Sequence, residues 1–270
     1  MRLSRIYLPL LAACSLLTGC VVDYAHVTKV NMEVTPAPEM RGASGYMKSG
    51  QSENRFTGSV NIGAKEDVEL KGIKNPIGSG CDSKCRKSIE HRVDDDVEAT
   101  YSIGYPYVTG SYERLNKSGS FLWSWGLGIN RGWYGLLTAG FNTKYFEIGV
   151  SDEVWLEFRD FRYSAEYYDD LFASGEDGGF MMLQNVVGAY ASVYLDNVSL
   201  NYSISAYRPS PSYSDTNVQA DFDLPYVLTE YITVGYRFTK TMEARLGVVN
   251  LFGEFPGWHW SGFGSFSINI

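Results

Sequence analysis

Apolar and polar residues alternate with a period of two along most of this chain. The stretch "FLWSWGLGIN" shows the pattern clearly, because large apolar residues fill its odd positions and small or polar residues fill its even positions from Ser124 onward. Successive side chains of a β-strand point to opposite faces, so this stretch predicts a strand with one apolar face. The apolar residues are Phe121, Trp123, Trp125, Leu127 and Ile129.

Similar alternating segments recur, and no long helical period appears. They predict an all-β fold of about ten strands, with eight to twelve possible. The expected strands are 56–62, 97–107, 121–129, 133–141, 146–155, a segment within 181–194, 198–206, 231–238, 242–250 and 260–270.

The connections between these segments alternate in length. Those expected on one side are mostly short, at 142–144, 195–197 and 239–241, with a longer one at 111–119. Those on the other side are mostly long, at about 65–96, 160–179 and 209–224, although the turn near 130–132 is short. Short periplasmic turns and long extracellular loops are typical of outer-membrane barrels.

The second face of the strands indicates what the apolar face touches. Along 198–206 this face carries only Ser and Asn, which suits a narrow lumen. Arg237, Glu243 and Arg245 would form an inward ion-pair network on neighbouring strands. We therefore predict an antiparallel up-and-down transmembrane β-barrel whose apolar face meets lipid. The alternative is a soluble periplasmic β-barrel or sandwich whose apolar face points inward.

Composition agrees with a barrel and limits the partners. The net charge of -8 and the pI near 5.0 argue against nucleic acid or an anionic membrane surface. Mean hydropathy is -0.18, which is compatible with alternating strands. The 20 Tyr and six Trp fit aromatic belts at the membrane interfaces.

The first residues, "MRLSRIYLPLLAACSLLTGC", have a basic start and an apolar run too short to span a membrane. They end in Leu17-Thr18-Gly19-Cys20, which resembles the bacterial lipobox. The resemblance implies a lipoprotein signal peptide at 1–19, a Cys20 acylated with palmitate-type chains, and sorting to the outer membrane. We expect residues 20–54 to form a periplasmic tether, with one short strand near 29–34, and residues 55–270 to form the barrel.

The last predicted strand, 260–270, ends at Ile270 with Phe266 before it. Its alternation resembles the signal that the barrel assembly machinery reads at the end of outer-membrane proteins. The expected partners are therefore outer-membrane lipid, the barrel assembly machinery and the lipoprotein export machinery. The extracellular ligand is unknown.

Two cysteines remain in the proposed exported chain, Cys81 and Cys85, as "CDSKC". An oxidising compartment favours a disulfide between them within a loop. A zinc site is disfavoured because His91 is the only nearby histidine.

Two patterns in the sequence are compatible with catalysis, and each also has a plain structural interpretation. His259 and Ser261 resemble the His-x-Ser of outer-membrane lipid A 3-O-deacylases, but Trp258 and Trp260 take the lipid-facing positions, so the pair would face the lumen or rim. Acidic residues in the proposed outer loops resemble the rim carboxylates of omptin proteases, or could bind calcium, although the regular calcium-loop spacing is absent. These acidic residues are Asp94, Asp95, Asp96, Asp169 and Asp170.

The first interpretation is thus a lipid-anchored outer-membrane barrel with a structural, surface-interaction or small-solute role, with no enzymatic activity and no cofactor. A barrel of this size with a filled interior conducts poorly, which favours surface interaction. The alternatives are a barrel enzyme with its site at the outer rim, deacylase-like or protease-like, and the soluble lipoprotein.

Overall fold

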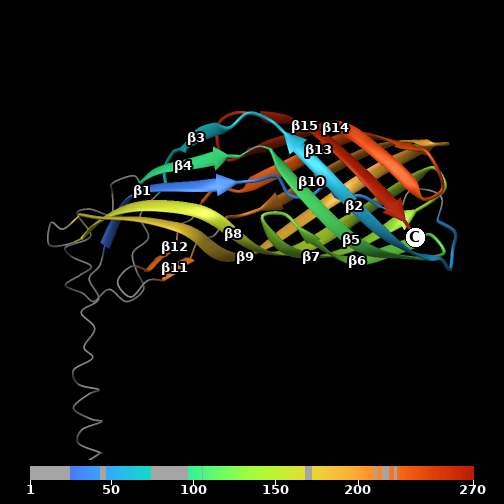
Figure 1. Ribbon diagram of the computed structural model, residues 1–270, viewed down its shortest axis with the longest axis horizontal. Helices are drawn as coiled ribbons and strands as arrows, with labels where there is room; N and C mark the ends of the chain where they lie inside the picture. The colour runs from blue at the N-terminus through green and yellow to red at the C-terminus, as the bar shows by residue number, and fades with distance from the viewer. Residues whose placement is uncertain are drawn as a thin grey trace, which may run out of the picture.

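The computed structural model describes residues 25–42, 47–73, 97–104, 106–167, 172–209, 212–214, 219–221 and 224–270. Ten antiparallel strands close into a barrel, and the pairing of β8 with β9 completes the ring (Figure 1). The barrel strands are β2 (Ser52–Ile62), β5 (Tyr107–Ser118), β6 (Phe121–Ile129), β7 (Gly132–Asn142), β8 (Phe146–Tyr167), β9 (Phe172–Leu195), β10 (Val198–Tyr207), β13 (Val227–Arg237), β14 (Met242–Gly253) and β15 (His259–Asn269).

Each barrel strand pairs with the barrel strands before and after it in the chain, and β15 pairs with β2. The predicted antiparallel up-and-down barrel of ten strands is therefore confirmed. We call one end of the barrel the turn end, because β5–β6, β7–β8, β9–β10 and β13–β14 are joined there by short turns. We call the other end the loop end. Gly119 and Asp196 adopt positive φ angles of 61° and 50° in two of the short turns, as tight hairpins require.

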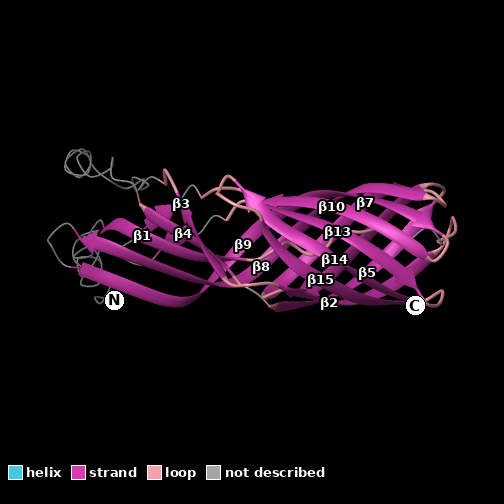
Figure 2. Cartoon of the chain, turned by 90° about the horizontal axis from the view of Figure 1, so that it is seen from above, coloured by secondary structure: helices cyan, strands magenta, loops and turns pink. Residues whose placement is uncertain are grey.

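A second part of the sheet extends beyond the loop end. β8 and β9 continue past the barrel, and β1 (Ala25–Val34) pairs antiparallel with this part of β8. β4 (Glu98–Ile103) runs parallel to β1 and pairs with β3 (Glu66–Leu70) on its other side. We call these five strands the extension sheet; Figure 2 shows it in line with the barrel.

The remaining described strands, β11 (Ser212–Ser214) and β12 (Gln219–Asp221), form a small hairpin in the connection between β10 and β13. Among the described residues, no helix is long and apolar enough to cross a membrane.

The apolar face of the barrel strands points outward. On β6 the side chains alternate strictly between exposed and buried, and Trp125 and Leu127 are 42% and 58% exposed. On β10, Ser203 is buried whereas its neighbour Tyr202 is exposed. The large outward residues include Phe56, Leu137, Ile148, Val187, Leu200, Val234, Leu246 and Phe266. The small polar residues face the interior, as the alternation predicts.

The structure differs from the sequence prediction in two regions. Residues 160–179, predicted to be a loop, lie mostly in β8 and β9, whose paired ends extend beyond the barrel. Residues 97–107 alternate like a barrel strand, but they divide into β4, in the extension sheet, and the start of β5. Residues 111–119, predicted to be a turn, instead lie almost entirely in β5. Within this stretch Glu113 points inward and pairs with Arg55 on β2.

The segment predicted to be a tether is largely folded. Residues 25–34 form β1, which includes the short strand expected near 29–34, and residues 35–42 are enclosed by the barrel. β1 lies at the loop end, whereas β2 begins at the turn end, beside the C-terminus. Asn54 and Ile270 bond there through their backbone groups, with both N···O distances 2.8 Å. The chain therefore crosses the barrel before its first barrel strand begins.

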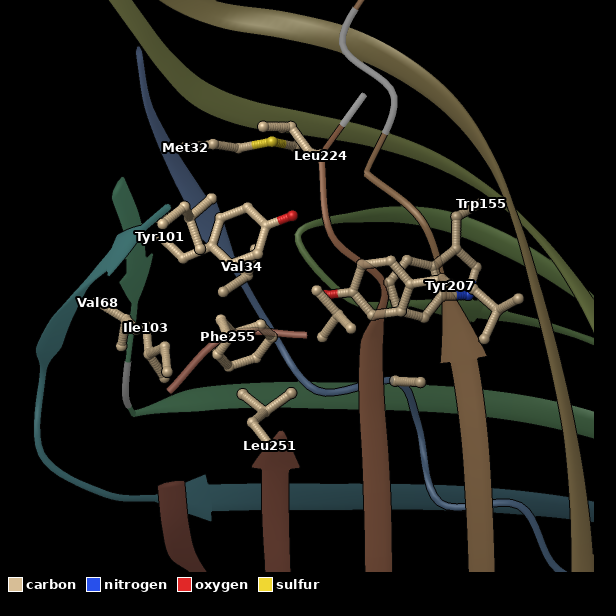
Figure 3. Packing of buried hydrophobic residues seen from close by; sticks show 14 of the residues in the cluster. Met32, Val34, Val68, Tyr101, Ile103, Trp155, Tyr207, Leu224, Leu251 and Phe255 are labelled. Carbon is tan, nitrogen blue, oxygen red and sulfur yellow. The ribbon is translucent and has the colours of Figure 1, made fainter. Parts of the chain in front are cut away.

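A hydrophobic cluster closes the loop end. Val34 from β1, Tyr101 and Ile103 from β4, and Leu251 and Phe255 from the β14–β15 hairpin meet there (Figure 3). The rings of Tyr101 and Phe255 pack edge to face, 5.4 Å apart. This cluster joins the extension sheet to the barrel through apolar contacts that exclude water.

Candidate functional site

The interior of the barrel is occupied by residues 35–42, "TPAPEMRG", which we call the luminal segment. All of these residues are buried except Glu39, which is partly exposed as a whole residue. The side chain of Glu39 is itself only 5% exposed. Fully extended, a chain of this length spans at most about 28 Å, close to the roughly 25 Å height of the apolar band in outer-membrane barrels. The segment is thus long enough to run through the whole lumen.

Near the loop end, side chains of the barrel bond to the backbone of this segment. Tyr207 Oη donates to the carbonyl of Thr35 at 2.6 Å, and Tyr231 Oη donates to the carbonyl of Ala37 at 2.7 Å. The Ala37 N–H donates to Thr229 Oγ1 at 3.0 Å.

The carbonyl of Pro36 is also satisfied by the barrel. Tyr107 Oη and Asn130 Nδ2 donate to it at 3.2 Å and 3.4 Å. Pro36 and Pro38 have no N–H, so neither adds a buried donor that would need a partner. The two prolines also keep the backbone extended, which suits a single chain inside a narrow lumen.

Halfway through the lumen, Glu39 is the acidic contact of the segment. Its Oε1 accepts from Thr233 Oγ1 at 2.5 Å and from Asn201 Nδ2 at 3.1 Å. Arg245 Nη1 lies 3.3 Å from the same oxygen. Asn201 Nδ2 also donates to the Met40 carbonyl at 3.3 Å. One carboxylate therefore links the segment to β10, β13 and β14.

Closer to the turn end, Arg55 holds the last part of the segment. Its guanidinium donates to the carbonyls of Gly42 and Arg41, and its Nε donates to Glu113 Oε2 at 2.7 Å. Arg41 itself donates to Thr57 Oγ1. Arg55 and Glu113 are both nearly inaccessible, so their charges depend on each other rather than on water.

Two glycines fix how the segment sits. A Cβ atom at Gly42 would lie 1.2 Å from Glu147 Oε1, so a side chain at this position would have to push the Glu147 carboxylate away from Tyr190, Tyr194 and Asn142. A Cβ at Gly188 on β9 would lie 2.2 Å from the Met40 sulfur, so Met40 packs on bare backbone there. These close approaches set the register of the segment along the barrel axis.

Glu147 belongs to a polar cluster at the turn end. Tyr190 and Tyr194 donate to its two carboxylate oxygens at 2.8 Å and 3.1 Å, and Asn142 Nδ2 donates at 2.5 Å. Lys117 bonds to Asn142 and, at 2.8 Å, to the carbonyl of Met47. This cluster thus contacts both Gly42, at the end of the luminal segment, and Met47.

The predicted inward ion-pair network is confirmed. Arg245 Nε donates to Glu243 Oε1 at 2.6 Å, and Arg237 Nη2 lies 3.7 Å from Glu243 Oε2. Arg245 is 1% exposed and thus requires these carboxylates. The sequence reasoning did not find that Glu39, from the supposed tether, completes the network.

A cavity of about 30 Å³ remains beside the segment, which is room for about one water. It is lined by polar side chains that include Glu39, Arg41, Ser151 and Glu153. This cavity beside the luminal segment is too small for an organic solute.

The structure places His259 and Ser261 on the inward face of β15, as the neighbouring tryptophans indicated. It does not join them into a catalytic pair. His259 Nδ1 is 2.7 Å from Glu66 Oε2 and its Nε2 is 3.3 Å from the Pro256 carbonyl, while Ser261 Oγ is buried without a hydrogen-bond partner. His259 instead links the barrel rim to β3 of the extension sheet.

The other predicted site residues lie outside the described residues. These are Cys20, Cys81, Cys85, Asp94, Asp95, Asp96, Asp169 and Asp170. Within the part of the chain that is described, no group of three or more His, Cys, Asp or Glu side chains is arranged to hold a metal ion.

Comparison with known proteins finds no matching family model and no matching curated protein. Among solved structures, the chain is similar to the CymD monoaromatic hydrocarbon channel, with 8% identity, 83% of this chain and 89% of that chain covered, and a TM-score of 0.35. It is also similar to the translocator domain of the autotransporter NalP from Neisseria meningitidis, with 10% identity, the same coverage of 83% and 89%, and a TM-score of 0.32. Likeness at this level carries no argument about function.

The buried pair Arg55–Glu113 provides a first test of the lumen. Glu113→Ala should reduce the free energy of unfolding by about 3–5 kcal/mol, because it leaves a buried guanidinium without its carboxylate. Glu98→Ala, which breaks the exposed pair Lys29–Glu98, should cost at most about 1 kcal/mol. Urea titration of both variants, followed by the shift between folded and unfolded bands on unboiled gels, measures the difference. Equal losses would contradict the buried pairing.

Proposed function

We propose that this protein is an integral outer-membrane barrel that is closed to solutes by its own chain and presents the extension sheet at the cell surface for interaction with other molecules. The observation that carries the proposal is the luminal segment, which connects the two ends of the barrel through its interior. We further propose that the protein has no enzymatic activity.

Support for a membrane location comes from the outer face. Exposed apolar side chains surround the barrel, an arrangement that water disfavours and lipid favours. Aromatic residues gather towards both ends: Phe252 stacks on Trp258 at 5.5 Å near the loop end, and Phe141 lies 6.0 Å from Phe146 near the turn end. Asp152 interrupts this belt on β8, at a cost if lipid surrounds it.

Closure to solutes follows from the filled lumen. The luminal segment bonds to strands around the barrel, the hydrophobic cluster lies at the loop end, and Glu147 and its partners lie against Gly42 at the turn end. In the described part of the chain, these groups occupy the interior that a solute would have to cross.

The orientation supports surface presentation. Outer-membrane barrels keep short turns on the periplasmic side, so the loop end and the extension sheet would face outward. The lipobox-like Cys20 precedes β1 by a few residues in the sequence, and we propose that it is acylated before β1 is exported to this outer side. The barrel assembly and lipoprotein export machineries would then act on the chain before β1 reaches the surface.

A charge in the middle of the apolar belt tests the membrane location. Leu246 is 72% exposed near the centre of β14, and Leu246→Arg should cost about 2–4 kcal/mol in lipid. Tyr145→Arg, at the turn end, should cost at most about 1 kcal/mol because the interface is hydrated. The two variants are compared by yield of heat-modifiable barrel in membranes. If both assemble like the wild type, the outer face does not meet hydrocarbon.

The orientation is tested with epitope tags on intact cells. A tag inserted after Gly72, in the turn that follows β3, should bind antibody, because this site lies at the loop end. A tag inserted between Lys144 and Tyr145, at the turn end, should bind antibody only after lysis. Surface binding at the second site alone would reverse the orientation and remove the extension sheet from the surface.

Closure is tested by electrical recording in planar bilayers. The wild type should show no steady current, whereas Gly42→Val should conduct, because its side chain would push the Glu147 carboxylate away from Tyr190 and Tyr194 and loosen the packing at the turn end. Gly110→Val is the matched control, since a Cβ at Gly110 meets no atom within 4 Å. A steady wild-type current equal to that of Gly42→Val would show that the segment does not close the barrel.

A further inference from the structure

We infer that the outer edge of β3, which faces away from β4, binds an extended cationic segment of a partner polypeptide. The segment adds a strand to the extension sheet and places basic side chains opposite Asp67 and Glu69. This inference deepens the proposed surface interaction by naming the chemistry of the partner. It rests on that proposal only for the side of the membrane on which the partner lies, because β3 has the same edge in either orientation.

β3 is the last strand of the extension sheet in the described part of the chain (Figure 1). It pairs with β4 on one side, and no backbone hydrogen bond joins its outer edge to a described residue. In an antiparallel pair, every second residue directs its N–H and C=O groups away from the neighbouring strand. The outer edge of β3 therefore offers a row of backbone groups with which an extended chain can pair.

This edge is held in place by apolar contacts on one face of β3. Val68 and Leu70 are buried and belong to the hydrophobic cluster at the loop end. Asp67 and Glu69, which alternate with them along the strand, point to the opposite face and are exposed. β3 is thus an ordered template, so a partner does not have to order it on binding.

The charges that neighbour β3 on its exposed face are already paired. Lys29 of β1 and Glu98 of β4 lie 2.9 Å apart, and Glu33 of β1 pairs with Arg131. These four side chains therefore contribute little net charge to this face of the extension sheet.

Two carboxylates of β3 keep a negative charge that no described cation balances. Asp67 Oδ1 accepts from the Ser102 hydroxyl at 2.5 Å, and Glu69 has no side-chain hydrogen bond or ion pair with a described residue. A strand paired with β3 places two of its own residues, also two positions apart, opposite Asp67 and Glu69. Lys or Arg at both positions would form two cross-strand ion pairs, so the edge selects a segment with basic residues at every second position.

An open pocket beside these carboxylates gives room for a long basic side chain. Its volume is about 340 Å³, which is within the range of ligand pockets, and it spans β1, β4 and the start of β3. The described residues that line it carry three carboxylates, those of Glu33, Glu66 and Asp67, and one ammonium group, that of Lys65. This excess of carboxylates favours an ammonium or guanidinium group over an anion.

A second copy of β3 fits this edge poorly. If two copies paired antiparallel about Val68, Asp67 of each copy would lie opposite Glu69 of the other. Like charges directly opposite each other destabilise a strand pair. The carboxylates that select a cationic partner therefore disfavour pairing of the protein with itself through β3.

The test uses full-length protein in detergent and a fluorescein-labelled peptide of sequence TKVKVKT, whose anisotropy should rise saturably as protein is added. The acidic peptide TEVEVET should show no saturable binding, because it brings like charges to the edge. TKVKVKT with every internal amide N-methylated keeps its charge but cannot donate hydrogen bonds to β3. It should bind at least about tenfold more weakly than the unmodified peptide.

Two double variants locate the site. Asp67→Asn combined with Glu69→Gln should bind TKVKVKT about tenfold more weakly than the wild type, because both partners of the lysines are lost. The matched control, Glu98→Gln combined with Glu254→Gln, removes two other exposed carboxylates and should bind within about threefold of the wild type. Heat modifiability shows that the barrel has formed in each variant.

Hydrogen exchange gives a second measure of the site. Amide exchange over residues 66–70 should slow when the wild type binds TKVKVKT, because backbone groups at the outer edge become hydrogen-bonded. TEVEVET should leave exchange over these residues unchanged.

Several results would overturn the inference. It fails if the wild type does not bind TKVKVKT, if the acidic or N-methylated peptide binds equally well, or if the two double variants bind with equal affinity. It also fails if the peptide slows exchange elsewhere but not over residues 66–70. Should the Asp67 and Glu69 variant not form a barrel, the peptide comparison and the exchange of the wild type still decide. A tag after Gly72 that binds antibody only after lysis would refute the surface location and leave the peptide result unchanged.

Discussion

A polypeptide inside a closed barrel must find partners for its backbone polar groups in the barrel wall, and this requirement organises the interior. The backbone N–H and C=O groups of the barrel strands bond to one another around the ring. Only side chains of the wall are therefore left to hydrogen-bond to the backbone of the luminal segment. Tyrosine hydroxyls, asparagine amides and arginine meet its carbonyls, and two prolines reduce the number of N–H groups that need acceptors. Many of the polar side chains on the inward face therefore provide hydrogen-bond partners for the luminal segment.

Charge inside the lumen follows the same logic. Buried ions are costly unless each is paired and hydrogen-bonded. Arg55 has Glu113, and Arg245 has both Glu243 and Glu39. Because Glu39 comes from the segment and not from the wall, Arg245 would keep only Glu243 as its bonded carboxylate without the segment. The contact that holds the segment also completes the network, so the two features stabilise each other.

The architecture could be predicted from the sequence because a barrel strand carries its own signal. One apolar face repeats every two residues, and this located most strands and the direction of His259. The sequence prediction was wrong where the structure of a segment depends on a contact with residues far away in the sequence. Glu113 marks a strand only when paired with Arg55, 58 residues away, and β4 alternates like a barrel strand although it pairs outside the ring. The luminal segment shows no alternation of apolar and polar residues, because the barrel surrounds it and none of its faces points to solvent or lipid.

β1 lies at the loop end of the barrel, whereas β2 begins at the turn end beside the C-terminus. The chain between β1 and β2 is therefore threaded through a closed ring of strands. A ring of ten hydrogen-bonded strands cannot close first and then acquire its thread unless the whole of β1 is pulled through the lumen. If the ring instead closes around a luminal segment that is already in place, the last pair of strands can join only after the segment has entered. The order of assembly is thus restricted by connectivity, through a part of the chain that belongs to no barrel strand.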